Sequence, residues 1–161
     1  MLAFSSAIEP LRLANYMAKK QIFSWNLLSI GEKDVVCSNG TRVLCDSNLE
    51  LDTHRDDTVI VCGGTDIKKS VTKKLLNWLR KESRKGVAIG GVCTAAQVMA
   101  MAGLLDGKKC TIHWENRDSF AEEFPEHHLT SAIYTVDGNR FTAAGGMASA
   151  DLMLHLIGAE F

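Results

Sequence analysis

VAIGGVCTAAQVMAMAGLL, residues Val87–Leu105, is the stretch of this sequence that decides the fold. Val87–Ile89 has the composition of a strand buried on both faces, and two glycines follow it directly. Small, helix-forming residues come after Cys93 and continue to Gly103, where we expect the helix to end. The stretch therefore predicts a strand, a tight turn with Cys93 at its tip, and a helix, which is the geometry of a nucleophile elbow.

The pattern around Cys93 allows two interpretations of this side chain. If the first amides of the following helix point toward the sulfur, they stabilise the thiolate and lower the pKa of Cys93. Alternatively, Cys93 is a small buried side chain in a strand–helix link, as free cysteines often are. The local pattern favours neither interpretation, so the rest of the chain has to decide.

The composition indicates one globular domain over residues 1–161, with enough chain for a substantial core. Hydrophobic residues make up 46% and charged residues 23%, and the net charge of −1 gives no general attraction to nucleic acid or anionic membranes. Five cysteines without a C-x-x-C motif indicate reduced thiols and a cytoplasmic setting. We expect no signal peptide, and the longest apolar stretch is too short to span a bilayer.

The spacing of apolar residues predicts helices and strands in alternation. The first expected element is a helix that starts near Ser6, with Ser6 and Glu9 as a capping box, and runs to Lys20. Before the elbow we then expect a strand over Ile22–Ile30, a hairpin turning at Ser38–Thr41, a buried strand over Thr58–Cys62 and a helix over Ile67–Lys85. After the elbow we expect a short strand near Cys110–His113, a helix over Trp114–Phe124, a hairpin over Ser131–Ala143 and a last helix after Gly145-Gly146. Eight of the 18 Lys and Arg residues fall between Lys68 and Lys85. We interpret them as a solvated helix face rather than a nucleic-acid contact.

This alternation argues for an α/β fold with a parallel sheet and a site at the carboxyl ends of the strands. Gly64, Cys93 and His113 each follow a strand-like run, so we expect them to converge there. His113 comes 20 residues after Cys93 and could act as its base, and the Gly63-Gly64 backbone could face the thiol with an amide. Such folds usually begin with a central strand, so we expect an upstream segment to be missing.

Four motifs resemble the ThiJ/PfpI superfamily, which has the class I glutamine amidotransferase-like fold. They are FSSAIEPLRLAN (4–15), VCGGTD (61–66), GGVCTAAQVMAMAGLLDGKKCTIHWE (90–115) and FTAAGGMASADLMLHLI (141–157). More closely, the chain resembles the amino-terminal sensor domain of AraC-family transcription regulators. The resemblance implies a flavodoxin-like three-layer sandwich with a mostly parallel central sheet. It also implies a homodimer that contacts DNA only through a carboxy-terminal domain absent from this sequence.

The resemblance assigns roles residue by residue. Cys93 matches the nucleophile of the superfamily, His113 its neighbouring histidine and Gly64 its oxyanion-hole glycine. The enzymes carry an acidic residue just before the first helix, and here Ala3 occupies that position, where it cannot relay a proton. Glu9 fills a position that is glutamate in sensors and enzymes alike, so it does not indicate catalysis. Cys93 and His113 are therefore expected to be vestigial as catalytic groups.

The leading hypothesis is a non-catalytic sensor domain for a small metabolite such as an amino acid, betaine or carnitine. Its predicted ligand-binding residues are Gly64, Cys93, Thr94, His113, Trp114 and Glu115. Trp114 and Glu115 suit a cationic amine, although Trp114 could equally be a core residue. No metal or cofactor and no membrane contact is expected. The alternatives are a cysteine-dependent hydratase, deglycase or amidohydrolase of the same superfamily, and a redox sensor that oxidises Cys93 to a sulfinate.

Overall fold

The computed structural model describes residues 1–31 and 34–160 of the chain. Its main sheet has four strands in the order β5-β6-β10-β9. The parallel strands are β5 (Thr58–Cys62), β6 (Ala88–Val92) and β10 (Arg140–Ala143), and β9 (Tyr134–Asp137) runs antiparallel to β10. The predicted α/β class with a mostly parallel sheet is confirmed.

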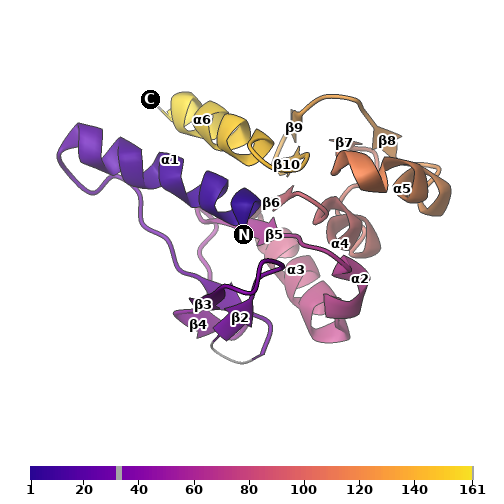
Figure 1. Ribbon diagram of the computed structural model, residues 1–161, viewed down its shortest axis with the longest axis horizontal. Coiled ribbons are helices and arrows are strands. Elements are labelled where there is room, and N and C mark those ends of the chain that lie inside the picture. Colours follow the sequence, from indigo (N-terminus) through magenta and orange to yellow (C-terminus); the bar gives the residue numbers. More distant parts are fainter. Residues whose placement is uncertain (32–33, 161) are drawn as a thin grey trace.

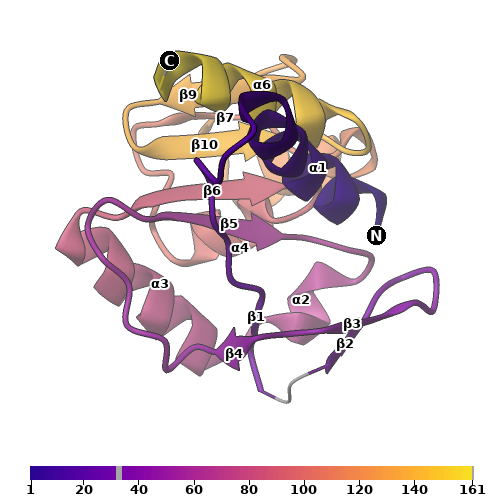
Figure 2. The ribbon, with the colours of Figure 1, turned by 90° about the vertical axis from the view of Figure 1, so that its left-hand side faces the viewer.

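Helices cover both faces of this sheet and complete the three layers (Figures 1 and 2). On one face α1 (Leu2–Ala18) packs along α6 (Ala148–Glu160), and on the other lie α3 (Lys73–Lys85) and α4 (Ala96–Met101). Each face has its own apolar core. Under α3 and α4 the core includes Leu79, Ile89, Val98 and Met99, and under α1 and α6 it includes Ala3, Val92, Phe141 and Leu152.

Shorter elements surround the sandwich. Three pairs of short strands belong to this group: the parallel pair β1 (Leu28–Ser29) and β4 (Ser47–Asn48), the hairpin of β2 (Asp34–Val36) and β3 (Arg42–Leu44), and the parallel pair β7 (Lys109–Cys110) and β8 (His128–Leu129). The short helices are α2 (Ile67–Ser70), the 3-10 turn η1 (Trp114–Asn116) and α5 (Arg117–Glu123). Within the described part of the chain, no helix combines the length and apolarity needed to cross a bilayer.

The predicted strand before the elbow is confirmed as the central strand β6, but the expected break at Gly90-Gly91 is wrong, because the strand continues through both glycines to Val92. Val87 and Ile89 have no exposed surface, because β6 lies between β5 and β10 and is covered by helices on both sides. The prediction that Thr58–Cys62 is equally buried is wrong. β5 is an edge strand of the main sheet, so its central residues are half-buried and its ends are exposed. Both predicted hairpins are present.

The first helix is confirmed, but its predicted start is wrong. α1 begins at Leu2, so Ser6 and Glu9 lie inside it and form no capping box. Ser6 is instead buried and donates a hydrogen bond to the Met147 sulfur, just before α6, at 3.5 Å. Pro10 also lies inside the helix, where its buried ring packs into the structure at the cost of one backbone hydrogen bond.

The strand predicted over Ile22–Ile30 is mostly absent, and only Leu28–Ser29 pairs with another strand. Side chains take the place of the missing partner strand. The Asn15 carboxamide accepts hydrogen bonds from the Ile22 and Phe23 amides and donates one to the Phe23 carbonyl, each at 2.8 Å. The backbone amides of Ile22 and Phe23 and the Phe23 carbonyl are thereby satisfied without a ladder.

The helix predicted over Ile67–Lys85 is interrupted between α2 and α3. The Thr72 hydroxyl accepts a hydrogen bond from the Leu75 amide at 3.1 Å and caps a new helix there. The strand predicted near Cys110–His113 ends at Cys110. The Thr111 amide then donates to the Thr142 hydroxyl at 2.8 Å rather than to a strand backbone.

Candidate functional site

The predicted nucleophile elbow is present between β6 and α4. Cys93 has a φ of 62°, a left-handed conformation that side chains other than glycine rarely adopt. Two backbone hydrogen bonds hold it there: the Cys93 amide donates to the Ala143 carbonyl at 3.0 Å, and the His113 amide donates to the Cys93 carbonyl at 3.1 Å. The elbow is thus fixed by β10 on one side and by the chain before η1 on the other.

The turn after β5 packs against the elbow through Gly63 rather than through Gly64. A Cβ on Gly63 would lie 2.4 Å from the Thr94 hydroxyl oxygen and 2.5 Å from the Ala95 amide nitrogen. A Cβ on Gly64 would meet no atom within 4 Å, and the Gly64 carbonyl accepts the Thr94 hydroxyl at 2.8 Å. Gly63 therefore allows the close approach, and Gly64 faces open space.

The different surroundings of Gly63 and Gly64 predict a large loss of stability for one alanine substitution and almost none for the other. Gly63→Ala should lower the free energy of unfolding by about 2 kcal/mol or more, because its methyl group overlaps backbone atoms that cannot move freely. Gly64→Ala should change it by less than about 0.5 kcal/mol. Urea denaturation of both variants measures the difference, and equal losses would contradict this placement of the turn.

His113 is held against the first residues that lead into α6. Its Nδ1 accepts a hydrogen bond from the Glu115 amide at 3.3 Å, which places the proton of the neutral ring on Nε2. A Cβ on Gly145 would lie 1.9 Å from Cδ2 of His113 and 2.5 Å from Nε2. The imidazole ring of His113 therefore packs closely against Gly145. The sequence had predicted Gly145 only as a residue that leads into the last helix.

Five of the six predicted ligand-binding residues line one cavity of about 420 Å³ at the carboxyl ends of β5 and β6: Gly64, Cys93, Thr94, His113 and Glu115. The elbow and η1 thus bring together residues that lie far apart in the sequence. The expected convergence of Gly64, Cys93 and His113 is therefore observed.

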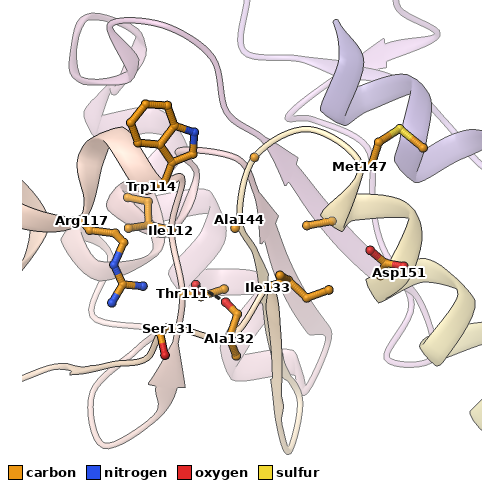
Figure 3. A pocket seen from close by; sticks show the side chains of 12 residues that line it. Thr111, Ile112, Trp114, Arg117, Ser131, Ala132, Ile133, Ala144, Met147 and Asp151 are labelled. Carbon is orange, nitrogen blue, oxygen red and sulfur yellow. Dashed lines mark hydrogen bonds between the residues drawn. The ribbon is translucent and has the colours of Figure 1, made fainter.

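Trp114, the sixth predicted residue, lines a neighbouring groove instead (Figure 3). Its side chain is 70% exposed, so the interpretation of Trp114 as a core residue is wrong. The side chains of His113 and Trp114 are stacked, with 5.7 Å between the ring centroids. The turn at residues 113–115 therefore separates the two hollows.

The rim of the Cys93 cavity carries charged and polar groups that the sequence did not single out. Gln97 on α4 donates to the Glu123 carboxylate of α5 at 2.8 Å, and Lys68 on α2 forms an ion pair with the same carboxylate. The Lys68 hydrogen bond lowers the pKa of Glu123, and the Gln97 bond adds to this effect. Three helices are thereby joined around the cavity.

The expectation of a lowered Cys93 pKa is wrong. Burial of the thiol raises its pKa above the ordinary value of 9.0, and the nearby Glu115 carboxylate acts in the same direction. A hydrogen bond from the Thr94 backbone opposes this change without reversing it. α4 contains only six residues, so its dipole offers little to offset the loss of solvation.

Groups that could activate Cys93 further are sparse among the described residues. Ala3 is 6% exposed and belongs to the apolar cluster against which Cys93 packs, so its side chain supplies no acidic group on that side. Residues 1–31 and 34–160 contain no cluster of three or more His, Cys, Asp or Glu side chains that could hold a metal ion.

The model of the DJ-1/PfpI family matches residues 6–159. The chain belongs to the DJ-1/PfpI family. Among curated proteins it is 39% identical over 160 residues to the HTH-type transcriptional regulator GbdR of Pseudomonas aeruginosa, covering 99% of this chain and 43% of the regulator. It is 43% identical over 157 residues to the regulator CdhR of the same species, covering 98% and 46%.

A similar protein with a solved structure is also a regulator. The crystal structure of an AraC family transcriptional regulator from Pseudomonas putida superposes with a TM-score of 0.86 at 29% identity, covering 99% of this chain and 85% of that chain. An isonitrile hydratase of Pseudomonas putida is 30% identical over 101 residues, 62% of this chain and 43% of the enzyme. This DJ-1/PfpI chain spans less than half the length of the curated regulators that it matches.

Proposed function

We propose that this DJ-1/PfpI domain senses an effector for an AraC-family transcription regulator and binds a small metabolite without converting it. The observation that carries this proposal is the combination of elbow geometry and thiol chemistry at Cys93. The residue lines a cavity of about 420 Å³, yet burial raises its pKa. A thiol that stays protonated near pH 7 is a weak nucleophile but remains a polar contact for a ligand.

The proposed contacts are the five residues that share this cavity. The backbone turn at Gly64 borders the cavity and would suit a ligand carboxylate, and the Glu115 carboxylate, with 63% of its side chain exposed, would attract an amine. This charge pattern supports an amino acid, a betaine or carnitine as the ligand. Trp114 would add a cation–π contact only for a ligand that extends past His113 toward the neighbouring groove.

The alternative is a cysteine-dependent enzyme such as a hydratase, deglycase or amidohydrolase. It is favoured by the left-handed conformation of Cys93 and by the presence of His113 in the same cavity. Against it stand the raised thiol pKa and the alanine at position 3. Turnover of an amide, isocyanide or glyoxal adduct that disappears in Cys93→Ser would favour the enzyme.

The similarity to HTH-type regulators supports a place for this domain in a longer DNA-binding protein. We propose that effector binding shifts an equilibrium between two conformations, which a separate DNA-binding domain reads. Such a protein would act as a homodimer in the bacterial cytoplasm. This domain itself is not proposed to contact DNA, because most lysines of α2 and α3 are paired with carboxylates.

A thermal-shift screen with amino acids, betaines and carnitine tests the proposed ligand class. A true ligand at about 100 times its Kd should add about 2.7 kcal/mol of stability, or roughly 5–10 °C in Tm. Glu115→Gln should weaken the response to ligands with an amine or quaternary ammonium group and leave the unliganded Tm nearly unchanged. The absence of any shift across the panel would refute this ligand class.

A further inference from the structure

The cavity at the elbow has charged side chains on two different walls. The segment that leads into and forms α2 supplies Asp66, Lys68 and Lys69, and the η1 turn supplies Glu115. Cys93 lines the same cavity. Charges from two separate elements therefore border the space around the thiol.

The wall formed by α2 has a net positive charge, which comes from Lys68. The Lys69 ammonium pairs with the Asp66 carboxylate at 2.7 Å, and because both side chains line the cavity their charges cancel there. Lys68 pairs instead with Glu123 of α5, a residue outside the cavity lining. An ammonium has three N–H donors, so one ion pair leaves donors of Lys68 available to a ligand.

The Lys68 ammonium is held at the cavity by a small hydrogen-bond network. The Oε2 atom of Glu123 accepts from Lys68 at 2.5 Å and from the Gln97 carboxamide at 2.8 Å. Gln97 is only 4% exposed on α4, which lies beside α2 (Figure 1). Since α2 has no buried residue of its own, this network is a firm attachment for its lysine. Glu123 and Gln97 therefore act as positioning residues for Lys68.

The opposite charge belongs to Glu115. Its carboxylate lies 3.7 Å from Nδ1 of His113, and this nitrogen accepts a hydrogen bond from the Glu115 amide. In the neutral ring Nδ1 thus carries no proton with which to neutralise the carboxylate. Within residues 1–31 and 34–160, no lysine or arginine forms an ion pair with Glu115. The Glu115 charge is therefore available to a cation in the cavity.

We propose that Lys68 receives the anionic group of the effector while Glu115 attracts its cationic group, so that the elbow cavity selects a zwitterion. The role of Lys68 rests on the proposed sensing function and adds a charged partner to the backbone turn at Gly64. A hydrogen bond between an ammonium and a carboxylate is stronger than one between neutral groups. A ligand with a single charge would leave one wall without a partner, which makes the pair of walls a device for discrimination.

Charge-selective labelling of Cys93 tests the two walls without knowledge of the effector. Two methanethiosulfonate reagents, one with a sulfonate and one with a trimethylammonium group, attack the same thiol and release the same leaving group. Their rate constants are measured at about pH 8 by mass spectrometry of the Cys93 peptide, which separates this thiol from the other cysteines. The ratio of the anionic to the cationic rate constant does not depend on the thiol pKa, so it reports the charge around Cys93.

The variants should move this ratio in opposite directions. Lys68→Met should lower it about three- to tenfold, because the positive charge of the α2 wall is removed. Lys68→Arg keeps the charge and should stay within about twofold of the unsubstituted protein. Glu123→Gln should raise the ratio, since Lys68 then lacks its counter-ion. Glu115→Gln should raise it as well, by removing the negative wall.

Lys73→Met is the matched control, because Lys73 is exposed at the start of α3 and lies outside the cavity lining. It removes the same charge and should leave the ratio unchanged, and circular dichroism should show each variant folded. An unchanged ratio in Lys68→Met, or an equal fall in Lys73→Met, would overturn the role of Lys68. A fall in Glu123→Gln would also overturn it, because both substitutions would then act by loosening α2. A metabolite found by thermal shift alongside any of these results would keep the sensing function and reject only the role of Lys68.

Discussion

Gly145→Ala is expected to weaken effector binding at least about tenfold and to destabilise the fold by about 1–3 kcal/mol. The new methyl group would lie 1.9 Å from Cδ2 of His113, so the imidazole has to leave the wall of the elbow cavity. Calorimetric titration with the ligand found by thermal shift measures the first effect, and urea denaturation measures the second.

Two further variants separate this contact from a general effect of alanine. Gly158→Ala lies in α6 with no atom within 4 Å of the new Cβ, so stability should stay level or rise slightly. Adding His113→Ala to Gly145→Ala removes the ring that clashes and should recover much of the lost stability. Full stability of Gly145→Ala alone, or no recovery in the double variant, would contradict the contact between Gly145 and His113.

Local patterns in the sequence predicted the elements that contain strong local signals. The run of apolar residues before Gly90-Gly91 predicted the central strand β6, and the small residues after Cys93 predicted α4. The turn at Asp137-Gly138-Asn139 predicted the β9–β10 hairpin. Because parallel strands present their carboxyl ends at one edge, the same interpretation also predicted that Gly64, Cys93 and His113 would share a cavity.

Features that depend on distant parts of the chain were not predictable in this way. Ile22–Ile30 alternates like a strand, but Asn15 of α1 bonds the backbone of Ile22 and Phe23 in place of a partner strand. Trp114 is adjacent to His113 and Glu115 in sequence, yet a 3-10 turn directs its side chain into a different hollow. The close fit of Gly145 to His113 joins segments that only the folded chain brings together.

The pKa of Cys93 is the clearest example of a property that local sequence patterns cannot predict. From sequence, the turn into a helix suggested a stabilised thiolate, since amides and a helix dipole favour an anion. In the fold, the helix is only six residues long and burial of the sulfur outweighs the Thr94 hydrogen bond. Solvation of a side chain depends on everything packed around it, which spacing along the chain does not report.

The central claim is that Cys93 helps to form a binding cavity and does not act as an activated nucleophile. The rate of its alkylation by iodoacetamide, followed by mass spectrometry of the Cys93 peptide between about pH 6 and pH 10, tests this claim most directly. Because burial raises the pKa and keeps the thiol protonated, the rate should still be rising at pH 9 and should level off only at higher pH. The same peptide in denaturant should show its ordinary profile, levelling off at lower pH. A plateau below about pH 8 in the folded protein would reveal a thiolate at neutral pH and contradict the claim.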